Sequence, residues 1–284
     1  MKISHIHAGF LKLDGGAMFG IVPKTIWNKL NPCDEKNLCT WAMNCLLVEL
    51  GDRKVLIDTG IGDKQSDKWK SFFEPHGPEN LMDSLRKAGI RPEEITDVLL
   101  THLHFDHCGG AVLKNESGDL APAFPNAVYW IESSHWAWAN EPNAREKASF
   151  LKENFMPLLD AGQVNFFKIN SHEDLDWMPG IALRPVFGHT EAMVLPIISA
   201  ASETFVYCAD LIPSSHHVGL PYVMAYDVRP LITIAEKDKL LAEALEGNWT
   251  LIFEHDPKVT TAKLSADESG RIILNEKPNA FLSK

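Results

Sequence analysis

The hydrophobic and polar positions of this 284-residue chain change period along its length, and these changes predict both strands and helices. Short apolar runs bounded by turn residues predict buried strands. They lie at 44–50, 54–57, 97–101, 127–131, 164–169, 181–187, 204–209 and 249–254. Looser alternation at 2–13 predicts an opening strand, and 258–274, with Gly270 at its turn, predicts a closing hairpin.

Other segments have the apolar spacing of helices. Residues 79–88 predict a short helix that stops at Gly89, and residues 235–246 predict one that stops at Gly247. A Trp-rich region predicts further helices at 134–138 and 144–159. Because helices alternate with strands, the pattern predicts an α/β fold with mixed strands.

The segment 98–110 carries the most distinctive chemistry. An apolar run ends at Leu100, and His102, His104, Asp106 and His107 follow within six positions. Imidazole and carboxylate groups are ligands that zinc and similar divalent metals take at neutral pH. The segment therefore predicts a metal site at the end of a strand.

The spacing His102-x-His104-x-Asp106-His107 after a strand resembles the signature of the metallo-β-lactamase superfamily of metal-dependent hydrolases. Members need three further ligands after later strands, and this chain has a candidate for each in the expected order. The candidates are His189, which follows Gly188, Asp210, which follows the run 204–209, and His255, which follows the run 249–254.

This resemblance implies an αββα four-layer sandwich of two mixed sheets face to face, formed by residues 1–284 as a single hydrolase domain. It also implies two divalent metal ions, zinc first, with manganese or iron accepted by the same ligands. One ion would be held by His102, His104 and His189. The other would be held by Asp106, His107 and His255, with Asp210 bridging the pair.

The implied chemistry is hydrolysis by a metal-bridging hydroxide, with Asp106 as both ligand and proton shuttle. Two divalent ions, two carboxylates and one hydroxide leave about one positive charge, which favours a transition state that gains negative charge. The resemblance is closest to lactonases and organophosphate hydrolases. We therefore expect a small, partly apolar lactone or carboxylic ester as substrate, with a phosphotriester or phosphodiester as the alternative.

Two non-hydrolytic alternatives remain on the same fold: a di-iron redox protein and a protein that senses a ligand without converting it. Three further side chains are candidates for supporting roles. Asp58 is expected either to orient a ligand histidine or only to form the turn before Gly60. Tyr222 is expected to donate to a substrate oxyanion or to pack in the interior, and His216 is expected to contact substrate from a loop.

Two regions have open interpretations. Residues 14–43 predict an irregular excursion that either lines the substrate pocket or packs over the sheet or a subunit. Residues 132–160 predict a helical insertion near the site that either caps it or packs on a sheet face or a partner subunit. The apolar side chains concerned are Met18, Phe19, Ile26 and Trp27 in the first region and Trp136, Trp138, Phe150, Phe155 and Met156 in the second.

Composition limits the classes of binding partner that we expect. The formal net charge of −11 argues against a nucleic-acid partner, and the absence of a basic cluster in the sequence favours an uncharged or weakly charged small-molecule substrate. The chain has no leader-like start and no apolar run of roughly 20 residues, which argues against a membrane. Five cysteines without Cys-x-x-Cys spacing indicate free thiols, so we expect a cytoplasmic protein, with a homodimer through the Trp-rich region as a hypothesis.

Overall fold

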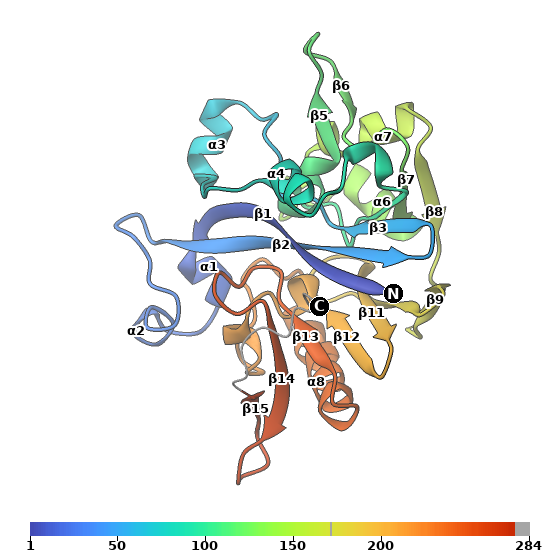
Figure 1. Cartoon of the computed structure of the whole chain (residues 1–284). Helices are drawn as coiled ribbons and strands as arrows, with labels where there is room; N and C mark the ends of the chain where they lie inside the picture. The colour runs from blue at the N-terminus through green and yellow to red at the C-terminus, as the bar shows by residue number, and fades with distance from the viewer. Residues whose placement is uncertain (171, 276–284) are drawn as a thin grey trace. The chain divides into compact units, whose positions relative to one another are not determined.

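The strands and helices of the computed structural model, which describes residues 1–170 and 172–275, belong to two units (Figure 1). The first unit comprises Met1–Leu11 and Ala42–Lys168, and the second comprises Lys12–Trp41 and the described residues from 169 onward. Each unit contains one large sheet with mixed strand directions and its own helices. The predicted α/β fold with mixed strands is confirmed.

The large sheet of the first unit has the strand order β1-β2-β3-β4-β7-β8. Strands β3, β4, β7 and β8 run parallel to one another, and β2 runs antiparallel to β3. The carboxyl ends of parallel strands meet at one sheet edge, so residues that follow β3, β4 and β7 are brought together there. The bounds are β1 Lys2–Asp14, β2 Leu38–Leu50, β3 Arg53–Ile57, β4 Asp97–Leu99, β7 Val128–Glu132 and β8 Val164–Phe167.

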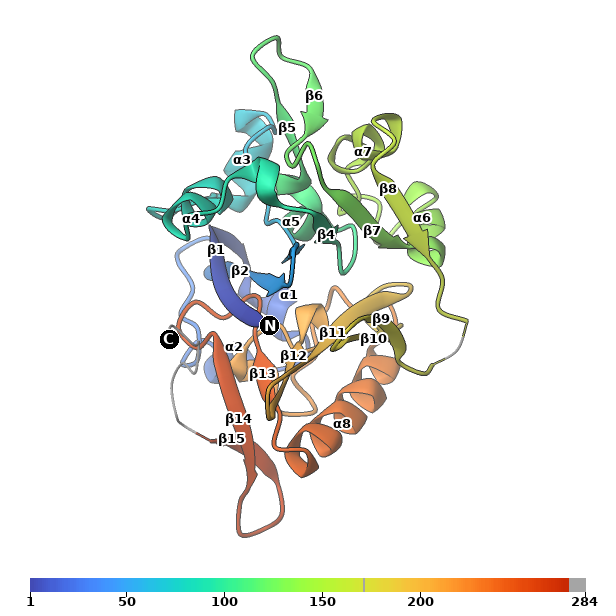
Figure 2. The same cartoon turned by 45° about the vertical axis from the view of Figure 1, so that its right-hand side comes forward.

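Short helices and a small hairpin complete the first unit. Figure 2 shows α6 and α7 beside β7 and β8, with the β5–β6 hairpin projecting from the same unit. The helices are α3 Asp67–Phe73, α4 Leu81–Lys87, α5 Phe105–Cys108, α6 Ser133–Asn140 and α7 Met156–Asp160, with 3-10 turns η1 Pro92–Glu94, η2 Gly109–Ala111 and η3 Lys152–Asn154. The hairpin strands are β5 Val112–Lys114 and β6 Leu120–Pro122.

The predicted helix over 144–159 is wrong. Only η3 and α7 form within or beside that range. The Asn143 side chain accepts hydrogen bonds from the backbone N–H groups of Arg145 and Glu146, which holds a turn there. Pro157 then falls in the first turn of α7, where proline begins a helix rather than continuing one.

The sheet of the second unit has the order β15-β14-β13-β12-β11-β10-β9. Its strands pair antiparallel except β12 and β13, which run parallel and are joined along the chain through α8. Figure 2 shows α8 running alongside this sheet. The bounds are β9 Leu175–Met178, β10 Ile181–Val186, β11 Met193–Ala200, β12 Glu203–Tyr207, η4 Ala209–Leu211, η5 Ser215–His217, α8 Pro230–Glu246, β13 Thr250–Ile252, β14 Thr261–Ala266 and β15 Ile272–Asn275.

The excursion at 14–43 is ordered and packs inside the second unit. It contains α1 Gly15–Phe19 and α2 Lys24–Trp27 before β2 begins. The Phe19 ring stacks on the rings of Trp27 and His217, with centroid distances of 5.6 and 4.9 Å. Phe19 and Trp27 therefore pack in the interior of this unit, whereas Ile26 remains 47% exposed.

Among residues 1–170 and 172–275, no helix is long and apolar enough to cross a membrane.

Candidate metal centre

The predicted ligands of the first unit lie in the turn between β4 and α5. His102 and His107 are completely buried, while His104 and Asp106 are each 7% exposed. Nε2 of His102 lies 3.1 Å from Nδ1 of His104, and the His102 and His107 rings lie 3.9 Å apart. Three imidazoles thus meet in the interior of the first unit.

Asp58, directly after β3, fixes the orientation of His107. Its carboxylate accepts hydrogen bonds from the backbone N–H and the hydroxyl of Thr101, at 2.8 and 2.7 Å. The same carboxylate lies 3.2 Å from Nδ1 of His107, so Nδ1–H donates to it and Nε2 keeps its lone pair for a metal. Asp58 has a φ of 57°, a left-handed conformation costly for a non-glycine residue, and these bonds hold it there.

Glu146, in the insertion, faces His104, although no local sequence pattern marks this glutamate. Its Oε1 lies 3.6 Å from Nε2 of His104. Its Oε2 accepts a hydrogen bond from the indole N–H of Trp138 at 2.8 Å and another from the Asn143 amide. Glu146 is 3% exposed and held in place on both sides, so Nδ1 of His104, on the His102 side, is the nitrogen left for a metal.

The second unit supplies the other three predicted ligands. His189 follows β10, Asp210 lies in η4 shortly after β12, and His255 follows β13. The two oxygens of Asp210 lie 3.1 Å from Nε2 of His189 and 3.0 Å from Nε2 of His255. One carboxylate therefore faces two imidazoles, which is the arrangement expected of a bridging ligand.

A second carboxylate, Asp227, holds His189 from behind. Its Oδ1 lies 2.8 Å from Nδ1 of His189, and both side chains are 1% exposed. Burial acts to lower the pKa of His189, but the Asp210 and Asp227 carboxylates outweigh it and raise that pKa to about 10. Two buried carboxylates face the His189 imidazole, so a positive charge at this place in the fold is stabilised.

The backbone at His189 is set by contact with α8. A Cβ on Gly188 would lie 2.3 Å from the backbone nitrogen of Thr233, so only glycine fits there without a shift. The Glu236 carboxylate accepts hydrogen bonds from the N–H groups of Phe187 and Gly188, at 2.7 and 3.0 Å. Helix α8 thereby determines where the turn presents His189.

The remaining candidates lie elsewhere in the second unit. Tyr222 is half-buried, with its ring edge-on to Phe19 at 6.4 Å. His216 is half-buried in η5, where it lines a pocket of about 810 Å³ together with residues of β14 and β15. These positions associate Tyr222 with interior packing and His216 with that pocket.

Two cysteines are close in sequence to the ligands. Burial raises the pKa of the Cys108 and Cys208 thiols to about 12. The Cys108 thiol donates to the carbonyl of Leu103 at 3.3 Å. Both cysteines therefore stay protonated near neutral pH and pack in the interior instead of acting as thiolate ligands.

A divalent metal ion fits the donor sets of both units. In the first unit the ligand atoms of His102 and His104, and those of Asp106 and His107, lie within 4.8 Å of each other, as do those of His189 and Asp210 in the second. The donors are imidazole nitrogens and carboxylate oxygens, buried and oriented by further carboxylates. That combination is the usual environment of zinc in proteins.

Comparison with known proteins agrees with this chemistry. The chain is 27% identical over 172 residues to an N-acyl homoserine lactonase of Bacillus cereus, an alignment that covers 57% of the chain and 58% of the relative. The chain thus spans under three fifths of the length of that curated relative.

Solved structures match over more of the chain. A probable metal-dependent hydrolase from Staphylococcus aureus is 28% identical, with a TM-score of 0.85 and 97% of each chain covered. AidC, a dizinc quorum-quenching lactonase in complex with the product N-hexnoyl-L-homoserine, is 20% identical, with a TM-score of 0.75, and the match covers 99% of this chain and 95% of AidC. At that identity, AidC bears on the fold alone.

A protein-family model identifies the family of this chain. The model of the metallo-beta-lactamase superfamily matches residues 41–255, which include every predicted ligand. The fold, the donor chemistry and this match lead to one conclusion: the chain belongs to the metallo-beta-lactamase superfamily.

Proposed function

We propose that the protein is a dinuclear metal-dependent hydrolase that cleaves a small, partly apolar lactone or carboxylic ester. The observation that carries the proposal is Asp210, whose two oxygens each face a buried imidazole at 3.1 and 3.0 Å. A carboxylate between two imidazoles is suited to bridge two metal ions. Family membership and lactonase relatives support the same reaction class.

The proposed ligand sets follow the family pattern. One ion takes His102, His104 and His189, the other takes Asp106, His107 and His255, and Asp210 bridges them. Zinc is our first choice, because imidazole and carboxylate donors suit it, and manganese and iron are alternatives. Since both units contribute candidate ligands, we propose that residues 1–284 act as one catalytic domain.

When bound, such metals lower the pKa of a coordinated water and polarise a substrate carbonyl. The chain's own contribution is orientation and proton transfer. Asp58, Glu146 and Asp227 each face one nitrogen of a candidate ligand imidazole, so that the other nitrogen of the ring faces the remaining candidate ligands. The Asp106 side chain is 10% exposed, which supports the proposal that this carboxylate passes a proton to a leaving group.

An aromatic cluster beside Asp106 supports a partly apolar substrate. The Phe105 ring lies 5.1 Å from that of Trp69 and 4.4 Å from that of Phe73. These side chains lie next to the proposed ligands in the first unit and offer an apolar surface to an acyl group. The curated relatives are named N-acyl homoserine lactonases, and the AidC structure holds an acyl-homoserine product.

The test is a hydrolysis panel on metal-loaded protein with the Asp106→Asn variant beside it. The panel contains lactones, aryl esters, phosphotriesters, phosphodiesters, β-lactams and thioesters. We expect lactones or esters to be cleaved fastest, and we expect Asp106→Asn to lower kcat by roughly 100-fold or more, as loss of a general acid–base group does. Circular dichroism checks that the variant is folded.

Two outcomes oppose the proposal. Near wild-type rates for folded Asp106→Asn would remove the role given to this carboxylate. A clear preference for phosphotriesters or phosphodiesters would replace the ester assignment with phosphoryl chemistry on the same ligands.

The proposed partner is a small molecule, with neither nucleic acid nor membrane involved, because the chain is acidic with a net charge of −11. All five cysteines are free thiols, which favours a reducing compartment, so we propose a cytoplasmic location. The homodimer stays a proposal, and light scattering tests it through the mass in solution.

A further inference from the structure

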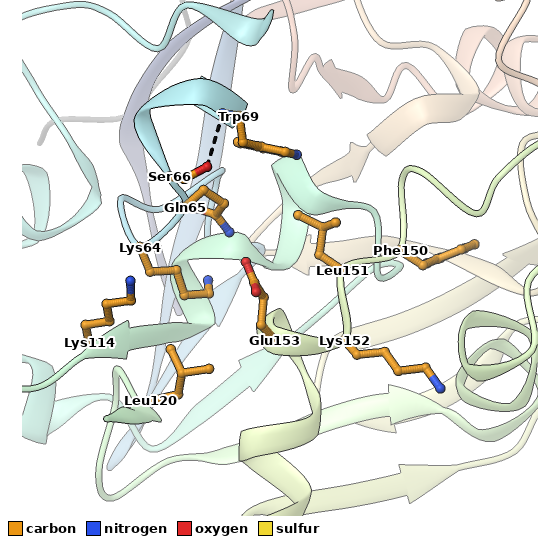
Figure 3. Close-up of a pocket in the computed structure, with 10 residues that line it drawn as sticks. All are labelled: Lys64, Gln65, Ser66, Trp69, Lys114, Leu120, Phe150, Leu151, Lys152 and Glu153. Carbon is orange, nitrogen blue, oxygen red and sulfur yellow. Dashed lines mark hydrogen bonds between the residues drawn. The ribbon is translucent and has the colours of Figure 1, made fainter. Parts of the chain in front are cut away.

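The first unit contains a pocket of about 620 Å³ beside the proposed ligands (Figure 3). Its walls come from the segment before α3, from α3 itself, from the β5–β6 hairpin and from the turn at η3. Three lysines and one glutamate line it, an excess of two positive charges in a chain whose net charge is −11. The lining residues are Lys64, Gln65, Ser66, Trp69, Lys114, Leu120, Phe150, Leu151, Lys152 and Glu153.

The buried ammonium of Lys64, in the pocket wall, lacks a full set of hydrogen-bond acceptors. Lys64 is only 5% exposed, and its ammonium donates to the carbonyl of Gly109. An ammonium has three N–H donors, so two remain without an acceptor in the part of the chain that the structure describes. Burial lowers the pKa of Lys64 to about 8, so the charge is present at neutral pH but poorly solvated.

A second buried polar group in the same wall also lacks a partner. Gln65 is 6% exposed, and its amide N–H donates to Oδ1 of Asn154 at 2.9 Å. Its Oε1 is buried without a hydrogen-bond partner among residues 1–170 and 172–275. Buried polar atoms are almost always paired, so this wall indicates a place for polar groups, with an acceptor oxygen for the Lys64 N–H groups and a donor, such as a water or a hydroxyl, for Gln65 Oε1.

Two side chains of the pocket wall contact the metal-binding turn. The Phe150 ring lies 4.7 Å from the ring of His104, and the Trp69 ring lies 5.1 Å from that of Phe105. Lys64 itself is bonded to Gly109, at the end of that turn. The pocket wall is therefore in ring contact with the turn that carries the proposed ligands.

The Glu153 carboxylate does not cancel the positive charge of the pocket. Figure 3 shows the ends of Lys64, Gln65 and Glu153 converging in the pocket, with Lys114 on the hairpin side and Lys152 pointing away. Glu153 and Lys114 are both exposed and of opposite charge, so they offset one another, and the buried Lys64 leaves the pocket with a net positive charge. A ligand group beside Lys64 therefore experiences mainly the lysine charge.

We propose that this pocket is a subsite for a carboxylate at the far end of the acyl group, with Lys64 and Lys114 as its cationic partners. The inference rests on the proposed hydrolase function and narrows it, because it makes the preferred substrate an anionic ester or lactone. It replaces the expectation of an uncharged or weakly charged substrate, since the fold gathers lysines that are scattered in the sequence.

The first test measures binding without turnover. Isothermal titration calorimetry of the full chain with glutarate is expected to show binding that weakens about tenfold in Lys114→Met, as loss of one charge-assisted contact does. Lys64→Met is expected to act likewise, and Glu153→Gln is expected to tighten binding. Lys168→Met, an exposed lysine outside the pocket in the same unit, is the matched control and should bind as wild type does.

The second test measures turnover of the 4-nitrophenyl half-ester of glutaric acid against 4-nitrophenyl pentanoate, which has the same acyl length without the charge. We expect kcat/KM to favour the half-ester by about tenfold in wild type, and we expect this ratio to fall to about one in Lys114→Met. Because Lys114 is exposed, this variant does not depend on the buried Lys64 being replaceable.

The two tests separate the subsite from the hydrolase. If both esters are cleaved equally well by wild type and variants, the subsite proposal is overturned and the hydrolase stands. If no ester is cleaved but glutarate binds and Lys114→Met weakens it, the hydrolase fails and the pocket is a site for a free carboxylate. Glutarate binding that is absent, or unchanged in both lysine variants, overturns the subsite.

Discussion

At the scale of single residues, the site is a set of imidazoles held by carboxylates. Asp58 faces His107, Asp227 faces His189, and Glu146 faces His104. Asp58 and Asp227 each bond one ring nitrogen of a histidine, while Glu146 faces Nε2 of His104 at 3.6 Å, so these carboxylates favour one tautomer and one ring position.

The Glu146 contact gives a prediction at this scale. We expect Glu146→Gln to weaken zinc binding about tenfold, the lower end of the usual effect of losing such a partner, because His104 is no longer fixed. Competition with a chromophoric chelator measures the affinity. Glu141→Gln, an exposed neighbour on the same insertion, is the control, and equal affinities in the two variants would contradict the role given to Glu146.

The ligands were predictable from the sequence, whereas two of their supports were not. His102 to His107 form a local motif after an apolar run, and the family pattern located the other three. Asp227 lies 38 positions from His189, and Glu146 lies in an irregular turn, so neither stands in a recognisable spacing. Only the folded chain brings these carboxylates to the imidazoles. Asp58 was identifiable because it directly follows a predicted strand.

At the scale of elements, strand ends and one helix position the ligands. The turn after β10 lies against α8 so closely that Gly188 has no room for a Cβ. The sequence predicted this helix over 235–246, and it begins earlier, at Pro230. Its first turn supplies Thr233, the contact that fixes the turn, so the missed boundary was also the functional part of the helix.

This contact predicts the effect of Gly188→Ala. A Cβ 2.3 Å from the Thr233 nitrogen forces the turn or the helix to move, and overpacking of this kind costs about 1–3 kcal/mol of unfolding free energy. Urea denaturation measures that cost. Gly16→Ala, where the nearest atom to the new Cβ is a side-chain oxygen at 3.1 Å instead of backbone at 2.3 Å, is the control. A Gly188→Ala variant as stable as the control would show that α8 does not constrain the turn.

The buried side chain of His217, in η5, predicts a pH dependence of stability. His217 is buried, bonded to Ser214 and to the carbonyl of Met18, and burial lowers its pKa to about 3. Below pH 6.5 this histidine is protonated in the unfolded chain, whereas in the folded chain it stays neutral until the pH approaches 3. The stabilisation is therefore complete above pH 6.5 and is lost as the pH falls toward 3.

From pH 7 to pH 5 we expect His217 to reduce the unfolding free energy by about 2 kcal/mol. Urea titrations at both pH values measure the loss. His217→Gln should remove this part of the pH dependence, whereas His76→Gln, at an exposed histidine, should keep it. If His217→Gln loses stability with acid as steeply as wild type, this histidine is not the responsible group.

At the scale of the whole molecule, the candidate ligands are divided between two units. The first holds His102, His104, Asp106 and His107, and the second holds His189, Asp210 and His255. Under the proposed function both units bind the same pair of ions. Metal binding to the folded chain should then stabilise it by mass action, and a chelator should lower its Tm.

The central claim is that these seven ligands form one two-metal site. The measurement that tests it most directly is the number of zinc ions per chain after equilibrium dialysis, determined by elemental analysis of the wild type, His102→Ala and His255→Ala. We predict two ions in wild type and a loss of bound zinc in each variant, although the two histidines belong to different units. One ion or none in wild type, or full occupancy in both variants, would contradict the account.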